Sequence, residues 1–305
     1  MEQKSIQKVL PVLRDTIQSM PSVVVLTRTG PAATFLINRI QDVTDLQKVV
    51  YESWDGPQEV NSRSRLERFR GQLRDRKRFL RERIYEELDG SRRLELAGRD
   101  AIFGHRWASV EQPTRSVEVL DRDWDAAKSE LEKNPPDLIL VFGTGLIPAR
   151  VTEVAKVACI NIHTGLSPHY RGQNCTYFCI LNEDFENIGV TVHVVRKAID
   201  GGEVLIQRRP QISSGDNEFT INMKNQRVGI DIYCEIVQAL QQGKLLNPRS
   251  QAKDVGILLM NRALTQGHRD LVRSLVKGGA VERYLTRAAN NRTRPKTIID
   301  ELQVA

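Results

Sequence analysis

Three polar side chains in the middle of the chain have the types and spacing of a catalytic group. Asn161 and His163 belong to an apolar, β-branched run, and a strand there would point both side chains to one face. Asp200 lies in a glycine-rich turn further along the chain. A histidine that titrates near neutral pH can donate or accept a proton. We therefore expect proton-transfer chemistry where this strand ends, which is where open α/β sheets bind ligands.

The elements around these residues predict an α/β fold with a Rossmann-like, doubly wound and mostly parallel sheet, because apolar strands alternate with helices. Strands are predicted at residues 23–26, 46–51, 117–120, 137–142, 159–163, 188–195 and 204–207, with a further strand end at 102–104. Helices are predicted at residues 5–19, 32–40, 124–133, 175–181, 216–240, 257–264, 270–277 and 281–288. No G-x-G-x-x-G motif is present, so we do not infer NAD.

Two blocks of sequence resemble a known family. The segments N-I-H at residues 161–163 and S-P-H-Y-R-G at 167–172 resemble the first signature of formyltransferases that use 10-formyltetrahydrofolate. The segments G-V-T-V-H at residues 189–193 and D-G-G at 200–202 resemble the second. Glycinamide ribonucleotide transformylase, methionyl-tRNA formyltransferase and sugar N-formyltransferases share these blocks, and their order and spacing make coincidence an unattractive explanation.

The resemblance implies that Asn161, His163 and Asp200 are catalytic. In formyl transfer an amine attacks the formyl carbon, so the site needs a donor to the developing oxyanion and a path for the proton. Asn161 would donate to that oxygen, His163 would donate to it or move the proton, and Asp200 would act as base or hold the ring. Asp200 is also expected to raise the pKa of His163 and favour the imidazolium. His193 is expected to support Asp200, and a Ser167–His163–Asp200 triad is a weaker alternative because Ser167 lacks nucleophile-elbow glycines.

The resemblance also implies binding residues for the donor and the acceptor. The donor 10-formyltetrahydrofolate would contact two loops, which contain Phe142, Gly143, Leu146, Ile147, Pro148, Arg196, Lys197, Ala198 and Ile199. The acceptor amine would pass four residues of another loop, namely Tyr170, Arg171, Gln173 and Asn174. Arg171 suits a phosphate or a carboxylate. Gly145 stands where the family often has a larger residue, which leaves the shape of the donor pocket open.

The net charge of +7 lies entirely at the C-terminus, since residues 244–305 hold 12 Lys or Arg and 5 Asp or Glu. We predict a catalytic domain at residues 1–242, with a charged helical insertion near 60–90, and a basic helical extension at 243–305. The basic extension and the charged helix could bind an anion or nucleic acid, or simply face solvent. Either the extension or the first helix could also form a homodimer contact.

The remaining composition narrows the class of protein. The four cysteines form no disulfide framework and no pattern of zinc ligands, so we expect free thiols and no metal. No apolar run has the length of a membrane span or of a signal peptide, and we expect a cytoplasmic protein without a membrane partner. The predicted function is formyl transfer to a small amine, with an amino sugar nucleotide, another phosphorylated amine and a natural-product amine as the candidates. The alternatives are a methionyl-tRNA formyltransferase-like enzyme and an RNA-binding protein on a relic fold.

Overall fold

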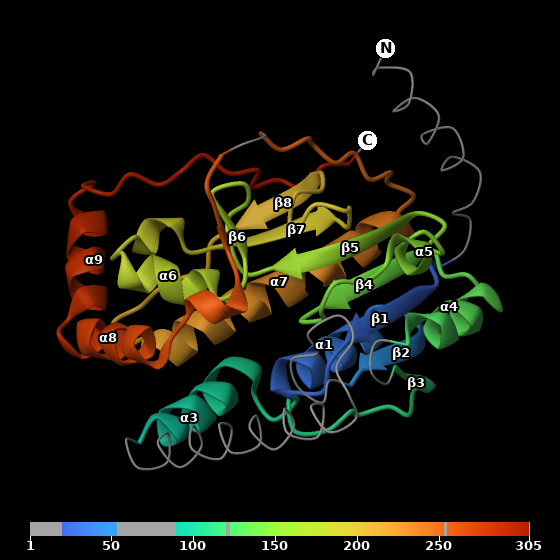
Figure 1. Ribbon diagram of the computed structural model, residues 1–305, viewed down its shortest axis with the longest axis horizontal. Coiled ribbons are helices and arrows are strands. Elements are labelled where there is room, and N and C mark those ends of the chain that lie inside the picture. The colour runs from blue at the N-terminus through green and yellow to red at the C-terminus, as the bar shows by residue number, and fades with distance from the viewer. Residues whose placement is uncertain (1–19, 54–89, 120–122, 253–254, 305) are drawn as a thin grey trace, which may run out of the picture.

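The computed structural model describes residues 20–53, 90–119, 123–252 and 255–304, which form a seven-stranded sheet and a separate pair of strands (Figure 1). The large sheet has the order β3-β2-β1-β4-β5-β7-β8. Its strands are β1 (Val23–Thr27), β2 (Leu46–Glu52), β3 (Ser116–Val119), β4 (Leu138–Phe142), β5 (Ala158–His163), β7 (Val190–Val194) and β8 (Val204–Arg208). The first five strands in this order run parallel, and β7 is antiparallel to both β5 and β8. The prediction of a mostly parallel, doubly wound sheet is confirmed.

Helices cover both faces of this sheet. One face packs against α1 (Pro31–Gln41), α3 (Ser91–Phe103) and α7 (Glu218–Gln241), and the other against α4 (Trp124–Glu132) and α5 (Ala149–Thr152). In β5, Ile160 and Ile162 join the first layer, whereas Cys159 joins the second. Because side chains alternate along a strand, Asn161 and His163 point to the same side as Cys159, away from α7.

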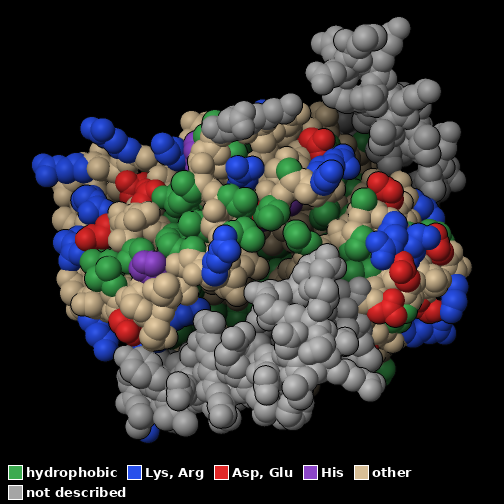
Figure 2. Space-filling view, viewed as in Figure 1, with side chains coloured by type: hydrophobic (Ala, Val, Ile, Leu, Met, Phe, Trp, Pro, Cys, Tyr) green, Lys and Arg blue, Asp and Glu red, His purple; other side chains and the backbone are tan. Residues whose placement is uncertain are grey.

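The C-terminal extension packs onto the rest of the molecule. A third apolar cluster joins α6 (Cys175–Leu181) and the short helix η2 (Phe185–Asn187) to α8 (Gln266–Lys277) and α9 (Ala280–Ala289). The last residues run along β8, where Gln207 N–H donates to the oxygen of Ile299 and Gln303 N–H donates to the oxygen of Leu205. Figure 2 shows Lys and Arg side chains gathered at the end of the molecule where α8 and α9 lie. The division at residue 242 into two domains stays a prediction.

Two predicted elements were wrong. The strand end predicted at residues 102–104 is the end of α3, where Phe103 packs its ring 5.0 Å from that of Phe35. The helix predicted at 257–264 is instead β9 (Ile257–Leu259) followed by the single turn η3 (Asn261–Ala263). β9 pairs in parallel with β6 (Tyr170–Gly172), and this pairing between segments far apart in sequence overrides local helix propensity.

The other predicted elements in the described ranges are present with small shifts in their ends. Helix α8 shows the largest shift, because it begins at Gln266 after the cap residue Thr265, whose hydroxyl accepts from His268 N–H. Helix α7 also has a capping box, in which Asn217 Oδ1 accepts from Thr220 N–H and Thr220 Oγ1 accepts from Asn217 N–H. The helices predicted at residues 5–19 and near 60–90 fall outside the described residues.

Candidate active site

His163 lies at the end of β5 and is almost completely buried. Its Nε2 atom is 2.8 Å from the backbone oxygen of Tyr170, and its Nδ1 atom is 3.3 Å from Oδ2 of Asp200. Gly165 makes room for the ring, because a Cβ atom there would collide with Nε2. Both ring nitrogens therefore face oxygens that can only accept hydrogen bonds while Asp200 is ionised.

Asp200 is the residue that joins the two histidines. It lies in the connection between β7 and β8 with φ 46°, in the left-handed region that aspartate tolerates better than most residues. Its Oδ2 atom accepts from Gly172 N–H at 2.7 Å, and its Oδ1 atom is 3.3 Å from Nε2 of His193. Burial would raise the pKa of Asp200, but His163, His193 and the Gly172 N–H together lower it to about 2. Asp200 is therefore a carboxylate at neutral pH.

Asn161 and His193 meet because the antiparallel pairing of β5 and β7 places them directly opposite each other. Asn161 Nδ2 is 3.2 Å from His193 Nε2, and His193 Nδ1 is 2.9 Å from the oxygen of Val194. Since a carbonyl only accepts, Nδ1 carries a proton, and Nε2 lies 3.2 Å from the Asn161 amide and 3.3 Å from Asp200 Oδ1. The four side chains thus form one connected group, with the predicted contact between His193 and Asp200 in place.

Burial decides the protonation of His163 more than Asp200 does. Desolvation lowers the pKa of His163, and the attraction of Asp200 offsets this only in part. The expectation that Asp200 produces a net rise in this pKa is therefore wrong. At neutral pH the ring is neutral, and it can take up a proton whose charge the adjacent carboxylate stabilises.

The alternative serine triad does not form. The Ser167 hydroxyl is buried and has no hydrogen-bond partner among the described residues, while its backbone N–H donates to Thr191 Oγ1. Beyond the two oxygens, His163 contacts the Cys175 sulfur, which lies 3.8 Å from Nε2. Burial raises the pKa of the Cys175 thiol, so this sulfur stays protonated.

Strand β6 lies between the catalytic group on one edge and the C-terminal extension on the other. Its first edge supplies the backbone oxygen that contacts the histidine and the N–H that bonds the aspartate. On the second edge, the His169 oxygen accepts from Ile257 N–H at 2.9 Å, and Gln173 N–H donates to the Leu259 oxygen at 2.7 Å. The extension therefore holds one wall of the candidate active site through β9.

The predicted acceptor-binding residues lie on and just after β6, but they face different surroundings. The Tyr170 hydroxyl donates to Asp184 Oδ2 at 2.6 Å and turns toward α6 rather than into the open. The Asn174 amide donates to Asn261 Oδ1 at 3.1 Å, and Gln173 is exposed. Arg171 is half-buried, and its guanidinium has no hydrogen bond or ion pair with any residue that the structure describes. Their role in binding stays a prediction.

The predicted folate-binding residues form two loops that are attached to the catalytic group. Residues 142–148 follow β4, whose last residue Phe142 pairs with Ile162 of β5. Residues 196–199 lead directly into Asp200. Several of these side chains are open to solvent, including Leu146 at 72% exposure. The structure brings both loops to the site, and their contact with folate stays a prediction.

A buried ion pair that sequence reasoning missed holds the first of these loops. Arg28 Nε donates to Glu52 Oε2 at 2.9 Å, and Gly145 N–H donates to the same oxygen at 2.7 Å. Glu52 Oε1 is buried and has no hydrogen-bond partner among the described residues, and a Cβ atom on Gly145 would lie 3.0 Å from it. The small residue at 145 is thus what allows the carboxylate to approach. Arg28 and Glu52 follow different strands and carry no motif, so no local signal links them.

Gln251 is a second missed residue. Its side-chain amide donates to the backbone oxygen of Asp200 at 3.0 Å and also to the oxygen of Gly202. A Cβ atom on Gly202 would collide with the backbone oxygen of Val194, so this turn packs tightly on β7. Gln251 therefore fixes the turn that carries the catalytic carboxylate. It lies in an irregular segment, and nothing in the local sequence indicates this contact.

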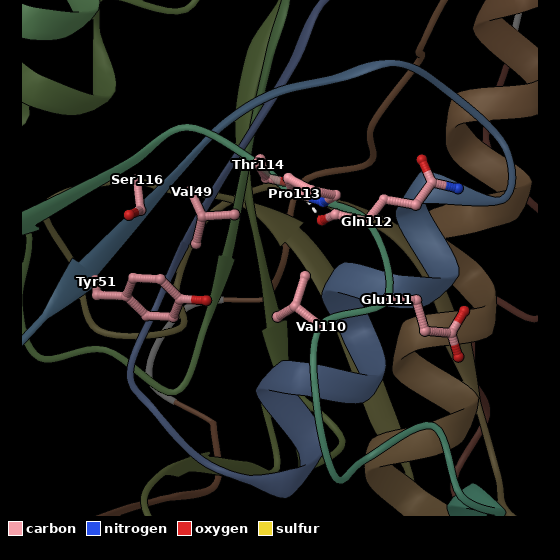
Figure 3. A pocket seen from close by; sticks show the side chains of 8 residues that line it. All are labelled: Val49, Tyr51, Val110, Glu111, Gln112, Pro113, Thr114 and Ser116. Carbon is pink, nitrogen blue, oxygen red and sulfur yellow. Dashed lines mark hydrogen bonds between the residues drawn. The ribbon is translucent and has the colours of Figure 1, made fainter.

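A separate cavity lies between β2 and the segment at residues 110–116. It has a volume of about 260 Å³ and is lined by Val49, Tyr51 and Ser116 together with residues 110–114 (Figure 3). None of the predicted site residues lines it. The Tyr51 side chain points into this cavity, and burial raises the pKa of its hydroxyl.

The comparison with known proteins agrees with the geometry. Residues 108–237 match the family model described as formyl transferase. This part of the chain is similar to formyl transferases. The methionyl-tRNA formyltransferase of Levilactobacillus brevis is 34% identical over 156 residues, which cover 48% of this chain and 49% of that protein. The methionyl-tRNA formyltransferase of Ehrlichia chaffeensis is 37% identical over 103 residues, which cover 33% and 34%. The matched part of this chain spans about half the length of these curated relatives.

Solved structures of similar shape come from the same family. A 4-N formyltransferase from Francisella tularensis gives a TM-score of 0.49 at 18% identity, covering 83% of this chain and 86% of that one. A phosphoribosylglycinamide formyltransferase from Streptococcus pneumoniae gives 0.47 at 17% identity, covering 72% and 99%.

Two negative observations concern metals and membranes. Within the described ranges, no group of three His, Cys, Asp or Glu side chains could hold a metal ion. None of the helices described there combines the length and apolar character that a membrane span requires.

Proposed function

We propose that this protein transfers a formyl group from 10-formyltetrahydrofolate to the primary amine of a small acceptor. The observation that carries the proposal is the connected group of Asn161, His163, His193 and Asp200 at the end of β5. It combines a neutral amide donor with a buried neutral imidazole that is backed by an ionised carboxylate. Formyl transfer to an amine requires this combination of an oxyanion donor and a proton acceptor.

Each residue of this group has a distinct task in the proposal. When bound, 10-formyltetrahydrofolate supplies a formyl carbon that bonds to the amine nitrogen as its bond to the folate nitrogen breaks. His163 accepts the proton that the amine loses and returns it to the leaving nitrogen. Asp200 stabilises the imidazolium between these steps. Asn161 uses one amide hydrogen toward His193 and has a second hydrogen for the negative oxygen.

The loop at residues 142–148 has one feature that fits a folate ring. Glu52 Oε1 lies next to Gly145 as a buried acceptor for which the described part of the chain offers no donor, and a pterin ring presents amino and N–H groups. A buried carboxylate oxygen gains most from such a donor, since an unmet hydrogen bond there costs free energy. In the proposal Glu52 receives the pterin edge, while the backbone of both loops encloses the ring.

Methionyl-tRNA is the second candidate acceptor, and the sequence relatives favour it. The relatives named above are methionyl-tRNA formyltransferases, but the matches cover only half of their length. The basic α8 and α9 could contact a phosphate backbone, although Arg273 lies 3.4 Å from Glu218 and Arg283 2.9 Å from Glu183, so part of that charge is neutralised. In the proposal, a small amine remains the preferred acceptor.

The deciding experiment starts with the donor. Calorimetry with 5-formyltetrahydrofolate, a stable analogue, should show saturable binding. Transfer from 10-formyltetrahydrofolate is then measured with amino sugar nucleotides, other amines and methionyl-tRNA. No binding at near-millimolar 5-formyltetrahydrofolate would contradict the proposal, and turnover with methionyl-tRNA alone would select the second candidate.

A further inference from the structure

Arg171 is a charged side chain whose binding partner is missing from the described residues. Its Nε atom is buried and unbonded, and its guanidinium forms no ion pair there. By contrast, the half-buried Arg208 forms two hydrogen bonds to Glu235, and Arg106 pairs with Asp42 and Glu111. A buried donor without a partner costs free energy, and more so when it is charged. An oxyanion with two oxygens would satisfy a guanidinium best.

Apolar side chains are exposed beside the same strand. Leu258 of β9 and Met260, two residues further along the chain, are 46% and 45% exposed. Figure 2 shows hydrophobic side chains gathered in the middle of this face next to a hollow, in the region where Figure 1 places β5 and β6. Exposed apolar side chains that cluster around a polar site mark a binding surface more often than chance exposure does.

The cation and the apolar side chains belong to one surface. In the parallel pairing of β6 with β9, Arg171 is the partner of Leu258, and paired residues point to the same face. The residues on both sides of Arg171 reach the catalytic group, since the backbone of Tyr170 contacts His163 and that of Gly172 bonds Asp200. A molecule that touches Arg171 and Leu258 therefore contacts the strand whose backbone meets His163 and Asp200.

We propose that the acceptor is an amine whose skeleton carries both an acidic group and an apolar substituent. Arg171 binds the acidic group, which is a carboxylate or a phosphoryl group, and Leu258 and Met260 cover the apolar substituent. This inference rests on the proposed function, since it names the class of amine that would receive the formyl group. It disfavours acceptors that are polar throughout.

Small amines that separate these features test the proposal. Leucine carries both an acid and an apolar group, glycine carries the acid alone, and 3-methylbutylamine carries the apolar group alone. The phosphonate analogue of leucine replaces the carboxylate and distinguishes the two kinds of acid. Binding is measured by titration at millimolar ligand with 5-formyltetrahydrofolate present, and formyl transfer is measured in parallel. We expect leucine or its phosphonate analogue to bind at least about tenfold more tightly than the other two amines, because a charge-assisted hydrogen bond and apolar burial both contribute.

Two variants locate the binding. Arg171→Gln should remove the preference for acidic amines, and Leu258→Ser should remove the preference for apolar ones, each by about tenfold. Leu271→Ser is the matched control, because Leu271 is 49% exposed and lies on α8. Circular dichroism and the melting temperature confirm that each variant is folded.

The outcomes separate this inference from the proposed function. Equal binding of all four amines, or no detectable binding of leucine and its analogue, overturns the inference even when 5-formyltetrahydrofolate binds normally. A change from dimer to monomer in Leu258→Ser, with amine binding unchanged, would show that β9 contacts a second copy and would also overturn it. Loss of 5-formyltetrahydrofolate binding in the unaltered protein contradicts the proposed function instead.

Discussion

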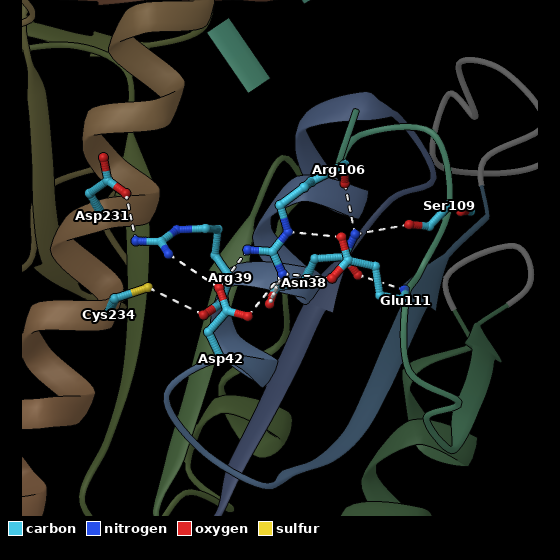
Figure 4. A network of polar contacts seen from close by, with 8 residues as sticks. All are labelled: Asn38, Arg39, Asp42, Arg106, Ser109, Glu111, Asp231 and Cys234. Carbon is cyan, nitrogen blue, oxygen red and sulfur yellow. Dashed lines mark hydrogen bonds and ion pairs between the residues drawn. The ribbon is translucent and has the colours of Figure 1, made fainter. Parts of the chain in front are cut away.

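Two networks of charged side chains in this molecule are built from similar interactions and differ mainly in burial. At the end of β5, Asp200 contacts two histidines, and all three side chains are at most 11% exposed. At the end of α1, Arg106 bonds Asp42 and Glu111, with side chains that are 31–45% exposed (Figure 4). The second network links α1 to the loop after α3 at the solvent-exposed surface.

Burial changes what the same contacts accomplish. The hydrogen bonds from Arg106 lower the pKa of Asp42 and of Glu111, and solvent screens these pairs. In the buried network the carboxylate attracts the histidine, yet desolvation still lowers the pKa of His163. A ring that stays neutral beside an ionised carboxylate can accept a proton, whereas a permanently charged arginine can only hold its partners. The comparison teaches that burial, more than the list of charges, distinguishes the candidate active site.

The largest effect should come from breaking the buried network. His163→Ala and Asp200→Asn should each reduce formyl transfer by about 10²–10⁴-fold, because each removes a part of the proton path. The fold and the affinity for 5-formyltetrahydrofolate should change little, as checked by circular dichroism and calorimetry. The control is His105→Ala, at an exposed histidine in the loop after α3. Full transfer in either active-site variant would refute the mechanism.

The pH dependence sharpens the contrast between the networks. His163 accepts a proton only when neutral, and its pKa lies below the ordinary value of 6.5. The rate should therefore fall with decreasing pH only below about 6.5, through the pKa of His163. In Asp200→Asn the carboxylate that raises this pKa is lost, so the pKa should drop further. Nuclear magnetic resonance titration of the His163 ring measures this pKa, and an upward shift in Asp200→Asn would show that Asp200 does not stabilise the protonated ring.

A smaller effect is expected at the residue that holds Asp200 from the C-terminal extension. Gln251→Ala removes two hydrogen bonds to the turn and should lower kcat about tenfold with little change in KM, because the carboxylate loses its fixed position. The acid side of the pH profile should move as well, since the contact between Asp200 and His163 loosens. Gln266→Ala on α8 serves as the control. An unchanged kcat and an unchanged pH profile would show that Gln251 does not position Asp200.

A weaker effect is expected from a substitution in the loop at residues 142–148, which is the proposed site of the pterin ring. Gly145→Ala places a Cβ atom 3.0 Å from Glu52 Oε1, so the loop must shift by a few tenths of an ångström. We expect the affinity for 5-formyltetrahydrofolate to fall several-fold, because this loop is the proposed pterin site. Gly267→Ala, whose nearest neighbouring atom would be 3.8 Å away, should bind normally. Equal affinities of both variants for 5-formyltetrahydrofolate would show that the contact between Gly145 and Glu52 does not affect donor binding.

The smallest effect is expected in the exposed network. Arg106→Gln should leave formyl transfer unchanged and lower the free energy of unfolding by only about 1 kcal/mol, because exposed ion pairs contribute little. Urea denaturation measures the difference. A loss of activity would mean that this network, and not only the buried one, supports the site.

The sequence was sufficient for much of the fold and for the identity of the proposed catalytic residues. Buried strands such as 138–142 are continuous apolar runs, and the period of two places Asn161 and His163 on one face. The two blocks around them resemble formyltransferases, in agreement with the match over residues 108–237. These signals are local, because they depend on residue types within a few positions of one another.

Only the tertiary structure determined how those residues are held and what state they adopt. The roles of Gln251, β9, Arg28 and Glu52 arise from contacts between segments far apart in the chain, and the predicted helix at 257–264 failed for this reason. The expected rise in the pKa of His163 failed because the sequence shows the neighbouring charge but not the depth of burial. Residue types and their spacing can be seen in the sequence, whereas desolvation and long-range strand pairing arise only when the chain folds.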